Sequence, residues 1–248
     1  SPIGIGAGIL KTLAKKGYSV IVSDLGENIG TNDNGSATRS AEEVVQNIAS
    51  CGGVAKAIPC DVRDEKQVVR LFELTLEEFG RIDVLINNAS MFYPSSLAQA
   101  KTTDWDKLFN SNVRAAFFLS QSLAKELSQR SGCIINIVDT HADKPLKDHA
   151  VYCMAKSALK SMTKSLSLEL APRVRVNGIS PGAILWPTEI EEEVHDKGQQ
   201  KKNAILDSIP LKRLGDPQDI SNLAYFFAEE GDYITGQVVK VDGGRSLV

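Results

Sequence analysis

Short apolar runs alternate with longer amphipathic stretches from one end of the chain to the other. The apolar runs are rich in β-branched residues, which is typical of buried parallel strands. This alternation predicts an α/β fold in which a parallel sheet is covered by helices on both faces. The predicted strands are Ser19–Ser23, Val54–Pro59, Ile82–Ile86, Cys133–Val138, Val174–Ile179 and Gln237–Val241. The predicted helices are Ile5–Lys16, Ala37–Ser50, Glu65–Phe79, Asp104–Gln129, Ala150–Leu170 and Pro217–Glu229.

The pattern runs without a repeat or a linker, so the 248 residues are expected to form a single domain, residues 1–248. Two segments interrupt the alternation. Gly26–Ser36 is a polar loop rich in glycine and asparagine, and Trp186–Asp207 is a charged insertion that is expected to be helical. The insertion comes directly before the last predicted helix.

Composition excludes several classes of function. A net charge of −3 and a pI near 5.7 argue against nucleic acid or a membrane surface as the main partner. No apolar run is long enough for a membrane span, and a cytoplasmic location is expected. The histidines and the cysteines lack the spacing of metal ligands, so no metal site is expected. These residues are His141, His149, His195, Cys51, Cys60, Cys133 and Cys153.

The chain enters its first predicted helix through Gly4-Ile5-Gly6, with no strand before it. A doubly wound sheet needs a strand there to deliver the chain to the turn, so we expect that a first strand is missing from this sequence. Glycines at a helix start allow the backbone to approach a pyrophosphate, whose charge the helix N-terminus favours. A simple tight turn is an equally good interpretation of these two glycines.

Asp24 ends the next predicted strand, about twenty residues after the glycines, where an acid binds the ribose hydroxyls of a dinucleotide. A carboxylate there repels a 2′-phosphate, and no Lys or Arg lies between Ile21 and Thr38 to offset it. Asp24, with Leu25 beside it, therefore favours NAD over NADP. The alternative is that Asp24 is only a turn residue that opens a polar loop.

Residues after three further strands are expected to complete the cofactor site. Asp61 could accept a hydrogen bond from an adenine amino group with Val62 packed on the ring, or it could cap the following helix. Small and amide residues after the fourth strand suit close approach of a cofactor. The expected cofactor residues are Gly4, Ile5, Gly6, Asp24, Leu25, Asp61, Val62, Asn88, Ala89, Ser90, Lys156, Pro181 and Gly182.

Tyr152 and Lys156 are four residues apart, which puts both side chains on one face of a predicted helix. A cation near a phenol stabilises phenolate, so we expect Lys156 to lower the pKa of Tyr152 from about 10. The phenol would then serve as a proton donor or acceptor near neutral pH. Asn112 lies inside a predicted helix, where asparagine is unfavourable, so it either orients a water or backbone group or is simply exposed.

Together these motifs resemble those of the short-chain dehydrogenase/reductase family, over essentially the whole chain. The resemblance implies a Rossmann-type fold, an NAD(P)(H) cofactor and a homotetramer. The motifs that carry it are Gly4-Ile5-Gly6, Asp61-Val62, Asn87-Asn88-Ala89, Asn112, Tyr152-x-x-x-Lys156, Pro181-Gly182 and Val241-Asp242-Gly243-Gly244.

From about Asn87 onward the chain is more narrowly similar to pteridine reductases of the bacterial dihydropteridine and dihydromonapterin reductase type. Asp139 stands where the wider family has a serine, and the resemblance identifies Phe92 as a ring that stacks on a pterin. An exposed aromatic residue on this loop could stack on a flat substrate, although a ring that covers the core is the commoner case. The narrower resemblance implies NADPH, whereas Asp24 implies NAD. The cofactor is therefore written as NAD(P)(H).

We expect hydride transfer from the nicotinamide to a small pterin or dihydropterin, with protons supplied by Tyr152 and Asp139. A carboxylate would repel the alkoxide of ordinary carbonyl reduction, but it can accept hydrogen bonds from the N–H groups of a pterin. Asp139 could instead only cap a helix or form a salt bridge, with the pocket elsewhere. Lys156 is expected to hold the cofactor ribose, and Asn112 to organise the proton relay.

Leu185 and Trp186 are expected to contact the substrate and, with the rest of residues 185–210, to close over it as a lid. Two other functions remain open. The first is a general carbonyl or 3-oxoacyl-thioester reductase of the same superfamily. The second is a non-catalytic nucleotide-binding protein that has kept the fold.

Overall fold

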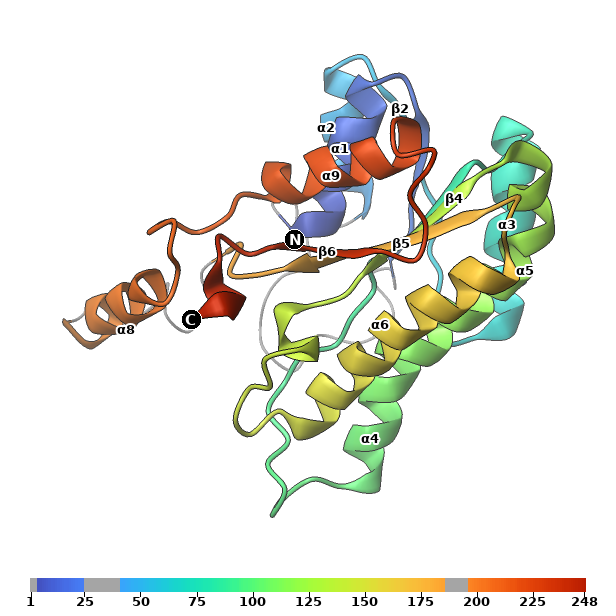
Figure 1. Ribbon diagram of the computed structural model, residues 1–248. Coiled ribbons are helices and arrows are strands. Elements are labelled where there is room, and N and C mark those ends of the chain that lie inside the picture. Colours follow the sequence, from blue (N-terminus) through green and yellow to red (C-terminus); the bar gives the residue numbers. More distant parts are fainter. Residues whose placement is uncertain (1–3, 25–40, 186–195) are drawn as a thin grey trace.

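A computed structural model of the chain describes residues 4–24, 41–185 and 196–248. The described residues form six parallel strands and the helices that pack against them (Figure 1). The strands are β1 (Ser19–Val22), β2 (Val54–Ala57), β3 (Val84–Asn87), β4 (Cys133–Ile137), β5 (Arg175–Pro181) and β6 (Val238–Val241). The helices are α1 (Ile5–Lys15), α2 (Ala41–Ser50), α3 (Glu65–Phe79), α4 (Thr102–Phe109), α5 (Ala115–Arg130), α6 (Ala150–Glu169), α8 (Asp196–Asp207) and α9 (Pro217–Glu229). Within these ranges no helix is long and apolar enough to cross a membrane.

The strands pair in two groups. β2 pairs with β1, and the remaining strands follow the order β3–β4–β5–β6. Every pair is parallel, so the carboxyl ends within each group meet at one edge. The α/β fold and its parallel sheet are confirmed, and each predicted strand is present. β1, β2 and β4 end one or two residues before the predicted runs do, β3 and β6 begin one or two residues later, and β5 extends two residues further, to Pro181.

Two layers of helices cover the sheet. Figure 1 shows α1, α2 and α9 on one face and α5 and α6 on the other. The sequence of β4 is apolar at almost every position because every residue of this strand is buried. Cys133, Ile135 and Ile137 belong to the core cluster that contains α1 and α9, whereas Ile134 and Val138 belong to the cluster that contains α5 and α6. A strand with both faces buried has no polar side to show.

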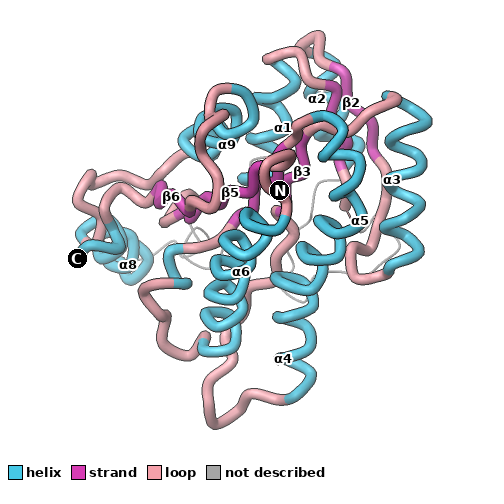
Figure 2. The backbone as a smooth tube through the Cα atoms, turned by 45° about the vertical axis from the view of Figure 1, so that its right-hand side comes forward, coloured by secondary structure: helices cyan, strands magenta, loops and turns pink. Residues whose placement is uncertain are grey.

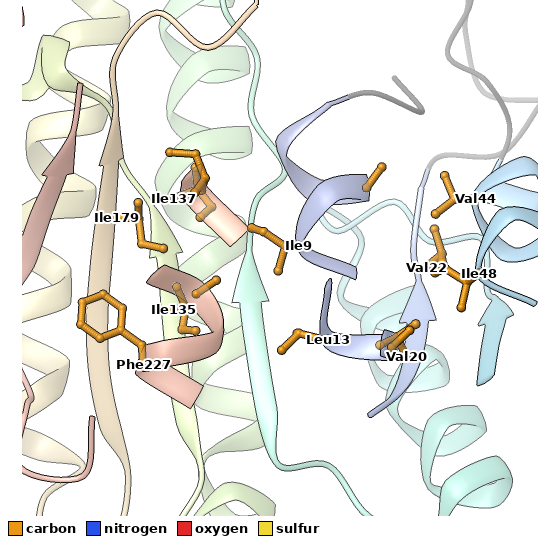
Figure 3. Close-up of a cluster of buried hydrophobic side chains, with 14 of the residues drawn as sticks. Ile9, Leu13, Val20, Val22, Val44, Ile48, Ile135, Ile137, Ile179 and Phe227 are labelled. Carbon is orange, nitrogen blue, oxygen red and sulfur yellow. The ribbon is translucent and has the colours of Figure 1, made fainter. Parts of the chain in front are cut away.

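A hollow of about 920 Å³ lies between β1 and β3, where the two groups of strands face each other without pairing. Figure 3 shows Ile9 and Leu13 of α1 between the β4 and β5 side chains and those of β1. The side-chain oxygen Oδ1 of Asn87, at the rim of this hollow, is buried without a hydrogen-bond partner among the described residues. No described residue forms a strand in this gap.

The predicted helix Asp104–Gln129 is not one uniform α-helix. It begins at Thr102 and is interrupted by a π-helical turn at Asn110–Arg114 before α5 begins. The segment is helical throughout, and within the π-helical turn Nδ2 of Asn112 donates to the backbone oxygen of Leu108, in the preceding turn, and to that of Met91, in the loop after β3. A π-helical turn inside an α-helix is often found at a functional site.

The predicted segments Gly26–Ser36 and Trp186–Asp207 are described only in part. Residues 25–40 and 186–195 lie outside the described residues, so Leu25 and Trp186 are not placed, and α2 is described from Ala41. The end of the charged insertion forms α8, as predicted. In both views α8 lies beyond β6, on the opposite side of the molecule from α3 (Figure 1, Figure 2). A lid role for residues 185–210 stays a prediction.

Candidate active site

The carboxyl ends of β3, β4 and β5 bring three loops to one edge of the sheet. Because these strands are parallel neighbours, with Asn87 opposite Asn136 and Ile137 opposite Ile179, the residues that follow them lie close together. Asp139 comes two residues after β4. The helix α6 packs against β5 and the turn after β4, and it delivers Tyr152 and Lys156 to the same edge.

Tyr152 and Lys156 are both buried on one face of α6, as their spacing predicts. The ammonium Nζ of Lys156 donates to the backbone oxygen of Ile137 at 3.0 Å and lies 5.8 Å from the centre of the Tyr152 ring. Burial lowers the pKa of Lys156 to about 8, and the charge of Asp139 opposes this shift. Lys156 therefore loses its positive charge in mildly alkaline solution.

Asp139 is in direct contact with the tyrosine. The hydroxyl of Tyr152 donates to Oδ2 of Asp139 at 2.7 Å, and the other carboxylate oxygen, Oδ1, accepts from the backbone N–H of His141 at 2.7 Å. The second bond caps the short 3-10 helix Thr140–Ala142. Asp139 is thus both a capping residue and a member of the site, and these two interpretations are not alternatives. The cap fixes the carboxylate in the position where it meets Tyr152.

The expectation that Lys156 lowers the pKa of Tyr152 is wrong for this arrangement. Burial raises the pKa of Tyr152 far above its ordinary value, and the charge and hydrogen bond of Asp139 raise it further. A carboxylate in hydrogen-bond contact disfavours phenolate more than a cation several ångströms from the ring can favour it. Tyr152 therefore keeps its proton at neutral pH and acts as a hydrogen-bond donor.

Asn112 lies in the π-helical turn, where it is only 1% exposed, so the interpretation as a simply exposed residue is wrong. Its side-chain Nδ2 donates to the backbone oxygens of Met91 and Leu108, both at 3.0 Å. Its Oδ1 accepts from the hydroxyl of Ser90 at 2.8 Å. Asn112 therefore ties the loop after β3 to the long helix. It orients backbone groups, one of the two roles that the sequence predicts for it.

A chain of buried amides beneath the site was not predicted from the sequence. Nδ2 of Asn87 donates to Oδ1 of Asn136 at 2.8 Å, and Nδ2 of Asn136 donates to the hydroxyl of Thr163 at 2.9 Å. These bonds fasten β3 to β4 and β4 to α6. The signal was present, because Asn136 is a polar residue in the middle of an apolar strand. Buried polar side chains there require partners.

Only some of the expected cofactor residues line the hollow between β1 and β3. Seven of them line the carboxyl-end half of the hollow, and the tyrosine, the lysine and Asp139 do not line it. A Cβ added to Gly6 would lie 2.7 Å from Nδ2 of Asn88, so any larger residue at this position would push the Asn88 side chain aside. Among the described residues no side chain caps the first turn of α1, and N–H groups at a helix start favour an anion. The seven residues are Gly4, Ile5, Gly6, Asp24, Val62, Asn88 and Ala89.

These observations fit a dinucleotide cofactor. The glycine turn would hold the pyrophosphate, and Asp24, two residues after β1, would face the adenosine ribose. Val62 would pack against the adenine ring. Asn88 and Ala89 would line the path of the cofactor toward the site. Ser90 lies farther along the same loop and binds Asn112, so its place is between the cofactor residues and the catalytic residues.

The carboxylate of Asp61 is bound by Arg63, the residue that follows Val62. Its carboxylate accepts from the backbone N–H of Arg63 and from two nitrogens of the Arg63 guanidinium, at 2.6–2.9 Å. This hydrogen bonding lowers the pKa of Asp61. The residue that caps α3 is Asp64, whose Oδ1 accepts from the N–H of Lys66. The interpretation of Asp61 as the cap is therefore wrong, and any bond to adenine would share a carboxylate that Arg63 already holds.

Pro181 and Gly182 have a packing role. Pro181 is the last residue of β5 and does not interrupt the strand, and the N–H of Gly182 donates to the backbone oxygen of Val241 at 3.0 Å. A Cβ on Gly182 would lie 2.7 Å from the Cα of Asp242. That contact is with backbone, which cannot give way as a flexible side chain can. Neither residue lines the hollow, and contact with a nicotinamide stays a prediction.

Phe92 lies at the mouth of the site and is 50% exposed, so the interpretation as a core residue is wrong. Its ring is 4.8 Å from the ring of Tyr152, at an interplanar angle of 79°. Leu185, which follows β5, is also exposed. Among the described residues, no three histidine, cysteine, aspartate or glutamate side chains are grouped so that they could hold a metal ion.

Comparison with known proteins gives relatives over the full length. A family model described as enoyl-(acyl carrier protein) reductase matches residues 2–246. The chain is 33% identical over 247 residues to the 3-oxoacyl-(acyl-carrier-protein) reductase FabG of Staphylococcus epidermidis, covering 98% of this chain and 95% of that protein. It is 32% identical over 244 residues to 7alpha-hydroxysteroid dehydrogenase of Escherichia coli, covering 97% of this chain and 89% of that protein. The crystal structure of acetoin dehydrogenase from Enterobacter cloacae has a TM-score of 0.81 at 30% identity, covering 98% of this chain and 92% of the other. None of these four names refers to a pterin.

Proposed function

Since the chain belongs to the short-chain dehydrogenase/reductase family and is thereby an NAD(P)(H)-dependent oxidoreductase, we propose that its substrate is a flat nitrogen heterocycle of the pterin or dihydropterin type. The observation that carries the proposal is the hydrogen bond of 2.7 Å from the Tyr152 hydroxyl to Asp139. The comparisons support the family and the class of reaction. The substrate is argued from the chemistry of the site.

A carboxylate beside the catalytic phenol selects against a substrate that develops negative oxygen. Two unit charges about 4 Å apart repel each other by about 4 kcal/mol in a partly solvated site. Reduction of a carbon–nitrogen double bond requires a proton on nitrogen instead, and a pterin also presents N–H and amino donors. The carboxylate of Asp139 can accept from such donors, as it now accepts from Tyr152 and from the N–H of His141.

When bound, a nicotinamide cofactor supplies the hydride. The residues of this chain hold and move the proton. Tyr152 is protonated at neutral pH and can turn its hydroxyl from Asp139 to a substrate nitrogen. As the hydride adds to carbon, this nitrogen would take the phenol proton, and a proton from solvent would restore the phenol. Asp139 then accepts an N–H of the substrate and fixes the orientation of the ring. Lys156 would hold the cofactor ribose with its ammonium group, and Asn112 keeps the loop that carries Ser90 against the site.

A second function is supported by the relatives. The FabG protein of Staphylococcus epidermidis is by name a 3-oxoacyl reductase, and its identity of 33% extends over 98% of this chain. Reduction of a ketone or of a 3-oxoacyl thioester would use the same Tyr152 and Lys156. It would need Asp139 to accept a proton or to turn away from the developing oxyanion. The comparisons favour this function, whereas the Asp139–Tyr152 contact favours a pterin.

A substrate panel with matched variants separates the two functions. The purified protein, Asp139→Ser and Asp139→Asn are each assayed with dihydrobiopterin, dihydromonapterin and an acetoacetyl thioester, with NADH and NADPH in parallel. Asn keeps the shape of Asp139 and a hydrogen-bond acceptor for Tyr152 but removes the charge. We expect both variants to lose pterin turnover by about a hundredfold or more, and the serine variant to gain reduction of the thioester. Unchanged pterin turnover in the serine variant, without any ketone reduction, would show that Asp139 has no such role.

A further inference from the structure

We infer that His149 is a positioning residue for the substrate site, which holds the Phe92 ring in place and thereby sets the preference for flat over open-chain substrates. The inference rests on the proposed function, because it takes a flat substrate as the one that Phe92 contacts. His149 belongs to no motif that the sequence presents, and its role is visible only from the contacts described next.

The rings of His149 and Phe92 are stacked. Their centres are 4.8 Å apart, and the angle between the ring planes is 16°. Phe92 also meets the ring of Tyr152 edge-on, with the same separation of 4.8 Å. The Phe92 ring is thus in contact with two other rings, that of Tyr152 and the imidazole three residues before it in the chain. A half-exposed phenylalanine on a loop would otherwise move freely among its rotamers.

His149 is itself firmly held. It is the N-cap residue of α6, and its ring nitrogen Nδ1 lies 2.8 Å from the backbone oxygen of Lys147. A carbonyl oxygen accepts only, so Nδ1 carries the proton of this bond. His149 also forms an isolated parallel bridge with Ser95, whose N–H donates to the backbone oxygen of Asp148 at 2.6 Å. The loop after β3 and the start of α6 are therefore joined twice, by backbone and by stacked rings.

The stack with His149 leaves part of the Phe92 side chain accessible to a substrate. The imidazole covers one face of the ring, and 50% of the side chain is still exposed. An offset stack of this kind stabilises one orientation by an amount equivalent to a factor of about two to ten. A flat substrate gains from a ring that is already oriented, since less freedom is lost on binding. An open-chain substrate that does not stack gains nothing from it.

Two variants separate the ring from its hydrogen bond. His149→Asn keeps a donor near the position of Nδ1 and a residue that is favourable at an N-cap, but it removes the ring. His149→Phe keeps a ring that can stack and removes the donor. For dihydrobiopterin we expect His149→Asn to raise KM by about two- to tenfold with kcat within about twofold, and His149→Phe to retain the KM of the parent protein. Neither variant should change KM for an acetoacetyl thioester.

The result that would overturn the inference is a pair of variants that behave alike, or KM values that change equally for both substrates. A purely structural role would lower the melting temperature of both variants and affect both substrates. If the parent protein turns over no pterin, the proposed function fails, and the same comparison is made with the fused-ring ketone 1-tetralone against the thioester. A selective rise in KM for the fused-ring ketone in His149→Asn alone would then still support the role of His149, and its absence would refute it.

Discussion

At the scale of single residues, Tyr152 and Lys156 have pKa values displaced in opposite directions by the same burial. Burial favours the uncharged form of each group, because a buried phenol resists losing its proton and a buried ammonium group gives one up. Asp139 adds to the shift of Tyr152 and opposes that of Lys156. The site therefore keeps its proton on the tyrosine, while the lysine is the group that titrates near physiological pH.

The first prediction concerns Lys156 and pH. Since the pKa of Lys156 is about 8, its positive charge is present below that pH and is lost above it. If the ammonium group holds the cofactor ribose, the dissociation constant of NADH should be constant up to about pH 7 and then rise, by up to about tenfold per pH unit. Titration of cofactor fluorescence from pH 6 to pH 9.5 measures this dependence.

Lys156→Met keeps a long side chain without the charge, and we expect weaker binding that no longer depends on pH in this window. Lys164→Met, on the exposed side of the same helix, is the control and should keep the pH dependence of the parent protein. A parent protein whose affinity for NADH does not change between pH 7 and pH 9.5 would contradict a charged contact from Lys156.

At the scale of elements, the π-helical turn at Asn110–Arg114 decides how the loop after β3 meets α4 and α5. Asn112→Ala removes the bonds to Met91, Leu108 and Ser90 and leaves buried groups without partners. We expect the free energy of unfolding to fall by about 1–3 kcal/mol and kcat to fall together with it, because the Ser90 loop loses its anchor. Urea unfolding and steady-state kinetics measure the two effects.

Asn110→Ala is the matched control, because Asn110 lies in the same turn and is half-buried. It should leave both the stability and kcat close to the values of the parent protein. Equal effects of the two alanine variants would show that the turn as a whole is sensitive to any shortened side chain. The hydrogen bonds of Asn112 would then not be the cause.

The sequence predicts the elements better than it predicts how they meet. Strands such as Cys133–Ile137 are visible because their pattern is local, and so is the shared face of Tyr152 and Lys156. The contact between Phe92 and His149 joins residues from a loop and a helix far apart in the chain, and no local spacing encodes it. The same reason explains why the pKa of Tyr152 is raised by burial and by Asp139, although the spacing to Lys156 predicts a lowered one. That effect depends on a distance that only the fold sets.

At the scale of the whole molecule, the residues expected to bind the cofactor lie on both sides of the gap between the two groups of strands. Asp24 follows β1 on one side, whereas Asn88 and Ala89 follow β3 on the other, and the start of α1 lies between them. No described strand joins β1 to β3, so the contacts across the gap come from helices and side chains, such as Ile9 and Leu13 (Figure 3). A ligand that contacts both sides would hold them together as well as fill a site.

We therefore expect a large thermal stabilisation by the cofactor, and a larger one by NADH than by NADPH. Binding to the folded state alone contributes about 2.7 kcal/mol at a hundred times the dissociation constant. For a chain of this size that amounts to a rise in melting temperature of roughly 5–10 °C. At equal concentrations NADH should give the larger rise, because the carboxylate of Asp24 accepts from ribose hydroxyls and repels a 2′-phosphate.

Differential scanning fluorimetry with both cofactors over a range of concentrations tests this, together with two variants. Asp24→Ser should reduce the difference between NADH and NADPH by removing the repulsion. Gly6→Val should abolish the response to both, since the added side chain would displace the Asn88 amide, 2.7 Å from a Cβ at this position, and fill the turn where the pyrophosphate is expected. A melting temperature that NADPH raises as much as NADH does would refute the role of Asp24. If Gly6→Val still responds fully, the glycine turn is not where the pyrophosphate binds, and the cofactor does not bridge the two groups of strands through α1.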